Sequence, residues 1–227
     1  MTTPPQQLRS ALDALDSAFA PLSESPFALG GCTYCYSDTD LEALAGPAHR
    51  VPDELISSVA AEVTDHWSAF AALYRRMTPR IVRLLTTDRL HVGHGLVASR
   101  LLTASWRSWA LPERQALERV WDAWWRSALH DYPGLGRATD VLETIAVSTG
   151  SLSPWLAVWT ETRTEAAAHH LDDALDHWLA DRKLADLRLG FHDELHAGPE
   201  LLSWLLSLEN GRVGAAQLFE VERLAYS

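Results

Sequence analysis

Apolar residues recur at helical spacing along most of the chain, and the clearest run lies between residues 111 and 130. Its members are Leu117, Val120, Trp121, Trp124 and Trp125. They lie at i, i+3, i+4, i+7 and i+8, the 3.6-residue period of an amphipathic helix with a wide apolar stripe. Pro112 is typical of the first turn of a helix, since its missing N–H is not needed there. The pattern predicts a helix with one face in the core and the other in water.

A second helix is predicted just before it, over residues 96–109, because Leu102, Trp106 and Trp109 lie at i, i+4 and i+7. With a short turn between them, the two helices are expected to form an antiparallel hairpin.

The same spacing, with start and stop signals, predicts most of the remaining elements. The expected helices are 6–20, 37–46, 52–63, 65–75, 81–85, 141–146, 153–159, 164–179, 198–205 and 212–225. Pro21 is expected to end the first helix, and Pro79 to break or kink the fourth. No segment alternates apolar and polar residues, so no strand is expected. The class is therefore all-α, either an irregular stack of antiparallel helix pairs of the HEAT type or an irregular helical bundle.

Length and composition are those of one folded unit. The chain has 227 residues, of which 47% are hydrophobic, enough for one substantial core. We expect a single domain over 1–227, with residues 1–31 forming an N-terminal helix and loop that lead into the core.

The charge balance bears on partners and location. The net charge is −11 and no Lys/Arg cluster is present, so a nucleic-acid partner is disfavoured. No apolar run reaches the length that crosses a bilayer, and the N-terminus has no basic region followed by an apolar stretch. We therefore expect a cytoplasmic protein that does not bind membranes.

Ten tryptophans are unusual for this length. Those of the central hairpin are Trp106, Trp109, Trp124 and Trp125. Packing in the core explains them, and an indole-lined groove for a partner helix or a small apolar ligand is the alternative.

Cys32 and Cys35 are the main candidates for chemistry. The Cys-x-x-Cys spacing lets two thiolates bind one metal ion or form a disulfide. As zinc ligands they need partners from elsewhere, and His66 or the pair His91 and His94 are the candidates. As a redox dithiol, Cys35 lies just ahead of a helix start, which lowers the pKa of a thiol, while the charges of Asp38 and Asp40 oppose that effect. The third interpretation is two thiols that only pack their loop.

Other polar patterns are weaker. His170, Asp173 and His177 share one side of the helix 164–179, where a solvated face explains them without a metal. His192 and His196 have the spacing of a zinc protease, but Asp193 stands where a Glu is expected. Because neither a Gly-x-Ser-x-Gly elbow nor a Gly-rich phosphate loop occurs, we do not expect a nucleotide-binding enzyme. The sequence favours a non-enzymatic protein and leaves an enzyme centred on the cysteines open.

Four short segments together resemble a group of uncharacterised bacterial cytoplasmic proteins. They are Gly30–Tyr36, Asp65–Trp67, Thr78–Leu85 and Trp109–Arg114. Members of that group share a Cys-x-x-Cys, a later Pro-Arg followed by an aliphatic helix, and a Trp-Pro-x-x-Glu-Arg-like turn. Here Ala110 and Leu111 separate the Trp from the Pro. The resemblance implies an all-helical, HEAT-like fold and no particular activity.

Three functions stay open at this point. The first is a non-enzymatic helical module that binds a protein partner, as an adaptor or regulator. The second is a metal-binding protein or enzyme centred on Cys32 and Cys35. The third is an inhibitor or immunity protein for a basic partner, which rests on the net charge.

Overall fold

The computed structural model describes residues 2–25, 27–180, 184–209 and 211–225. It is helical almost throughout, which confirms the all-α class. Contacts divide the chain into two compact units, Met1–Trp124 and Trp125–Ser227. The boundary falls inside one helix, and the expected single domain over 1–227 stays a prediction. Within the described residues no helix is long and apolar enough to span a membrane.

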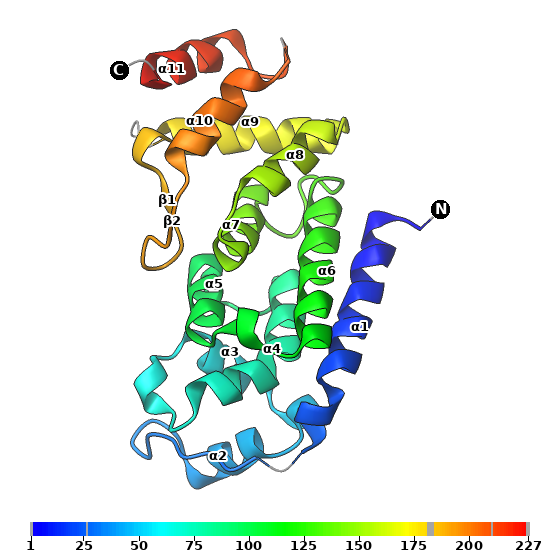
Figure 1. Cartoon of the computed structure of the whole chain (residues 1–227), viewed down its shortest axis with the longest axis vertical. Helices are drawn as coiled ribbons and strands as arrows, with labels where there is room; N and C mark the ends of the chain where they lie inside the picture. The colour runs from blue at the N-terminus through cyan, green and yellow to red at the C-terminus, as the bar shows by residue number, and fades with distance from the viewer. Residues whose placement is uncertain (1, 26, 181–183, 210, 226–227) are drawn as a thin grey trace. The chain divides into compact units, whose positions relative to one another are not determined.

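The first unit is built around its longest buried helix, α4, which packs against α1, α3 and α5 (Figure 1). Its elements are α1 (Pro4–Glu24), α2 (Asp38–Ala45), η1 (Ala48–Arg50), α3 (Asp53–Ala61), η2 (Thr64–His66), α4 (Phe70–Thr86), α5 (His94–Thr103), η3 (Trp106–Ser108) and most of α6 (Leu111–Ala128). Neighbours on several sides bury α4 nearly all round. Its core residues therefore include polar ones, and these need partners.

Two prolines do not end helices where the sequence predicted. Pro21 lies in the last turn of α1, which runs on to Glu24, and Pro79 lies inside α4. In α1 the Ser25 hydroxyl donates to the Pro21 carbonyl (2.5 Å) and extends the final turn. In α4 the buried Thr78 hydroxyl donates to the Tyr74 carbonyl (2.8 Å). Packing against α1 and α3 offsets the backbone hydrogen bond that Pro79 cannot make.

The first helix of the expected central hairpin is shorter than predicted. It ends at Thr103, because Ser105 adopts a left-handed conformation (φ 55°) that turns the chain into η3. Trp106 and Trp109 thus do not continue its stripe. The Trp109 indole instead donates to the Ala104 carbonyl (3.0 Å) and meets Phe19 edge-on at 5.7 Å. In α6, Glu113 is buried and forms a two-point ion pair with Arg75 (2.7 and 2.8 Å).

The second unit is organised around Trp159. Its indole contacts those of Trp125, Trp178 and Trp204 at centroid distances of 5.3, 6.2 and 5.4 Å. Its elements are the end of α6, α7 (Ala138–Thr149), α8 (Ser153–Glu161), α9 (Glu165–Leu179), η5 (Leu184–Asp186), β1 (Arg188–Leu189), β2 (Leu195–His196), α10 (Gly198–Ser207) and α11 (Ala215–Ala225). Packing of α9 against α7 and α11, and of α10 against α11 and η5, completes its core.

The two short strands correct the expectation that no strand occurs. They pair antiparallel, with Leu189 opposite Leu195, and Gly190 (φ 95°) helps to reverse the chain between them. The pattern from His192 to His196 therefore lies on a hairpin and not on a helix, so it lacks the one-face geometry of a zinc protease.

Candidate functional site

Cys32 and Cys35 lie in a tight turn directly before α2. The Cys35 and Tyr36 amides both donate to the Cys32 carbonyl, at 3.1 and 3.0 Å. Ser37 then caps α2: its hydroxyl accepts from the Asp40 amide, and the Asp40 carboxylate accepts from the Ser37 amide at 3.0 Å. The turn and the cap fix the backbone on both sides of the second cysteine.

The turn is anchored to the segment around η2. The Cys32 amide donates to the His66 carbonyl (2.9 Å), and the Ser68 amide donates to the Gly30 carbonyl (2.8 Å). Between these bonds Gly31 pairs with Trp67 as an isolated β-bridge. A Cβ atom at Gly31 would lie 2.7 Å from a Leu41 methyl and 3.2 Å from the Trp67 ring, so a side chain here would have to displace both neighbours.

Aromatic stacking supports the same junction. The rings of Tyr36 and Trp67, both buried, lie 4.4 Å apart. The Tyr36 hydroxyl donates to a Glu62 oxygen at 3.2 Å, and the other Glu62 oxygen lies 3.3 Å from His66 Nδ1. Burial and the charge of Glu62 raise the pKa of Tyr36, so its hydroxyl stays a donor. These contacts hold the cysteine turn against η2 and place the Glu62 carboxylate near it.

The two thiols differ electrostatically. Hydrogen bonding from the Cys35 amide, and then from the Tyr34 amide and the Cys35 thiol, lowers the pKa of Cys32, against smaller opposing effects of burial and the charge of Glu62. The thiol that donates this bond, Cys35, has its pKa raised, first by that bond and then by burial. This reverses the expectation from the sequence, which placed the lowered pKa on Cys35. The amides of the turn act on Cys32, the first cysteine. The prediction from the sequence rested on the start of α2, which lies next to Cys35.

Both cysteines are reduced and open to solvent: Cys35 is exposed and Cys32 half-buried. Tyr34, between them, is 97% exposed, which is extreme for an aromatic side chain. Thiol–disulfide exchange requires a thiol whose thiolate form is stabilised, a second thiol next to it, and access of the substrate to both.

The candidate zinc ligands are not gathered into one cluster. Among the described residues no group of three or more His, Cys, Asp or Glu side chains is placed to hold a metal ion. His66 adjoins the cysteine turn through its backbone, while its imidazole faces Glu62. His91 is exposed in a left-handed conformation (φ 51°), and His94 stacks on Trp124 at 5.8 Å. Zinc at Cys32 and Cys35 stays a prediction.

The four tryptophans proposed for a partner groove are all buried. Trp106, Trp109, Trp124 and Trp125 are at most 6% exposed. Trp124 contacts Trp121 and His94 in the first unit, and the Trp125 indole donates to the Trp155 carbonyl (2.9 Å) in the second. These indoles pack the core, and their burial leaves them without the exposed ring surface that a partner groove needs.

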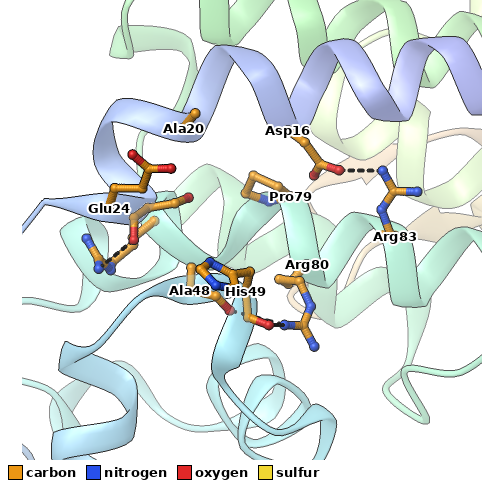
Figure 2. Close-up of a pocket in the computed structure, with 10 residues that line it drawn as sticks. Asp16, Ala20, Glu24, Ala48, His49, Pro79, Arg80 and Arg83 are labelled. Carbon is orange, nitrogen blue, oxygen red and sulfur yellow. Dashed lines mark hydrogen bonds and ion pairs between the residues drawn. The ribbon is translucent and has the colours of Figure 1, made fainter.

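A pocket of about 240 Å³ lies between α1, η1 and α4, and sequence reasoning did not foresee it (Figure 2). Three arginines of α4 line it, Arg76, Arg80 and Arg83, at i, i+4 and i+7. Figure 2 shows Arg80 reaching the His49 carbonyl (3.0 Å) and Arg83 reaching Asp16. Arg80 also pairs with Asp53 at 2.6 Å.

Arg76 is the buried member of this row, at 4% exposure. Its guanidinium donates to the carbonyls of Leu22, Ser23 and Ser25 at the end of α1, and to that of Gly46 after α2. Both ends of the segment that carries the cysteines are thus bound to one side chain. We interpret the arginine row as the tie between this segment and α4. The signal in the sequence was three of the four arginines of α4, which lie at i, i+4 and i+7 on one side of the helix.

Comparison of the chain with protein-family models, with curated proteins and with solved structures finds no match. The resemblance to uncharacterised bacterial proteins stays an expectation, and the geometry of the Cys32–Cys35 turn is the basis for a function.

Proposed function

We propose that the protein carries out reversible thiol–disulfide exchange at Cys32 and Cys35. The observation that carries the proposal is a pair of free, accessible thiols in one tight turn, where the Cys35 and Tyr36 amides both donate to the Cys32 carbonyl. Two thiols at Cys-x-x-Cys spacing can close a disulfide within such a turn. Cys32 is the attacking residue, because the thiolate is the nucleophile and its turn stabilises that form.

The exchange has two steps. Cys32 Sγ, as thiolate, attacks one sulfur of a substrate disulfide; that S–S bond breaks, and the leaving sulfur takes up a proton as the first released thiol. Cys35 then loses its proton, and its Sγ attacks Cys32 Sγ in the mixed disulfide, so that the second thiol leaves. The substrate gains two electrons and two protons, and the Cys32–Cys35 dithiol gives them up. The reverse direction oxidises a substrate dithiol.

The helical interaction module predicted from the sequence is the second candidate. Tyr34 is almost fully exposed, and Val63, which precedes η2, is half-exposed. Exposed apolar side chains on these two segments favour contact with another protein. This second candidate includes HEAT-like stacking of the helices, a cytoplasmic location and a protein partner. It is compatible with the exchange if the partner carries the disulfide.

Trapping of the mixed disulfide tests the proposed exchange. Cys35→Ser removes the second nucleophile, so a model disulfide should leave a stable adduct on Cys32, visible by intact mass. The wild-type chain should instead lose two hydrogen atoms and close the Cys32–Cys35 bond. Cys32→Ser is the matched variant and should react far more slowly. Equal reaction of the two single variants, or no internal disulfide in the wild type, would rule out the proposed roles.

A further inference from the structure

The cysteine turn lies in a stretch of the chain that has many carboxylates and almost no basic residues. Between residues 10 and 74 only one Lys or Arg occurs, Arg50. The same stretch has ten carboxylates, at Asp13, Asp16, Glu24, Asp38, Asp40, Glu42, Asp53, Glu54, Glu62 and Asp65. Five of these belong to the two segments that meet at the turn, namely Asp38, Asp40, Glu42, Glu62 and Asp65. Asp13 and Asp16 pair with Arg83, and Asp53 pairs with Arg80 and Arg89. The field that a substrate meets at the thiols therefore comes from the five carboxylates of these two segments.

Among these carboxylates, that of Glu62 is held at the junction beside the turn by Tyr36 and His66. The Glu62 carboxylate interacts electrostatically with both Cys32 and Cys35. Asp40 is held in its charged form, because the Ser37 hydroxyl and amide donate to it and lower its pKa. Asp38 and Asp65 are exposed, and Asp65 directly precedes the residue whose carbonyl binds the Cys32 amide. Unit charges at separations below the Debye length of about 8 Å at physiological salt are only partly screened.

Tyr34 is a second feature that attracts cations. Its ring is 97% exposed and lies between the two cysteines in sequence. The face of an exposed aromatic ring attracts the ammonium of Lys or the guanidinium of Arg. A cation next to the substrate disulfide therefore meets both an aromatic face and several carboxylates.

We propose that the Cys32–Cys35 dithiol selects cationic disulfides, that is, disulfide bonds flanked by Lys or Arg in a basic protein or peptide. This inference rests on the proposed exchange and names its substrate class. The dithiol is the reacting group, and the carboxylates act through their charge on the approach and binding of the substrate. Anionic disulfides such as oxidised glutathione are repelled by the same groups and are poor substrates.

Three small disulfides of different charge test the selectivity. Cystamine carries two positive charges, hydroxyethyl disulfide is neutral, and dithiodipropionate carries two negative charges. Loss of free thiols in the reduced protein is followed with each, at low ionic strength and in about 1 M salt. Each rate is divided by that of reduced Cys-containing peptide Gly-Cys-Gly with the same disulfide in the same buffer. We expect cystamine to exceed dithiodipropionate by about tenfold or more at low salt, with most of the difference lost at high salt.

Charge-neutral variants identify the source of the selectivity. Asp38→Asn with Asp65→Asn removes two exposed carboxylates from the segments at the turn and should reduce the cystamine preference severalfold. Glu118→Gln with Glu54→Gln makes the same change in net charge outside those segments and should leave the preference nearly intact. Circular dichroism of each variant confirms that it is folded.

The outcomes separate the two proposals. Exchange with all three disulfides at equal normalised rates, or fastest with dithiodipropionate, overturns the selectivity and leaves the exchange standing. Exchange with none of them overturns the proposed function itself. An equal effect of the two double variants would assign the preference to net charge and overturn the role of the carboxylates at the turn.

Discussion

Replacement of Arg76 by Met should loosen the segment that carries the cysteines. The Arg76 guanidinium binds carbonyls at both ends of that segment, at Leu22, Ser23, Ser25 and Gly46. A hydrogen bond from a charged donor is worth about 1.5–3 kcal/mol, so four would give roughly 6–12 kcal/mol if they were additive. The buried guanidinium must also be desolvated, which offsets much of that sum. We expect Arg76→Met to lower the free energy of unfolding by about 3–5 kcal/mol, the usual cost of breaking a buried charged network.

Two variants calibrate this value. Arg76→Lys keeps the charge but has three donors for four acceptors, and should lose roughly 1–2 kcal/mol. Arg50→Met removes an exposed arginine nearby in sequence and should stay within about 0.5 kcal/mol of the wild type. Urea unfolding followed by tryptophan fluorescence gives the stabilities.

Amide hydrogen exchange provides the local measurement. Peptides covering residues 29–46 should exchange faster in Arg76→Met than in the wild type at the same denaturant-free pH, because their ends are released from α4. If Arg76→Met behaves like Arg50→Met in both stability and exchange, the interpretation of the arginine row as a tie is wrong.

Two further predictions concern the turn itself. In Cys35→Ser, alkylation of Cys32 by iodoacetamide should reach half its maximal rate at a lower pH than in the urea-unfolded chain, because backbone amides stabilise the Cys32 thiolate and lower its pKa; equal midpoints would refute this. Gly31→Ala should cost about 1–2 kcal/mol, because its Cβ would meet Leu41 and Trp67, whereas Gly136→Ala has open space and should cost little; equal stabilities of the two variants would contradict the close approach.

Local sequence patterns predicted many of the helices. The structure contains the helices that three local signals marked. These signals are Ser37 with Asp40 at the start of α2, Thr164 at the start of α9, and the apolar stripe of α6. Packing decided the exceptions: α4 continues through Pro79 because helices surround it, and α5 stops at Thr103 because Ser105 turns the chain. The two-residue strands were too short to give an alternating pattern.

The site was predictable only in part. The spacing of Cys32 and Cys35 named the residues, but the pairing of their turn with residues 66–68 is a long-range contact that periodicity cannot reveal. For the same reason the direction of the amides, and with it the choice of Cys32 as the activated thiol, needed the structure. The arginine row was visible in the sequence, yet its carbonyl partners are 30 to 54 residues away.

A redox titration of the wild-type protein tests the exchange most directly. The protein is equilibrated in buffers of defined dithiol and disulfide ratio, alkylated, and its thiols counted by mass spectrometry, with metal content measured on the same sample. We predict that Cys32 and Cys35 are oxidised together as one two-electron couple that closes an internal disulfide. Thiols that stay reduced at every ratio, or that are protected by a stoichiometric metal ion, would contradict the proposed exchange.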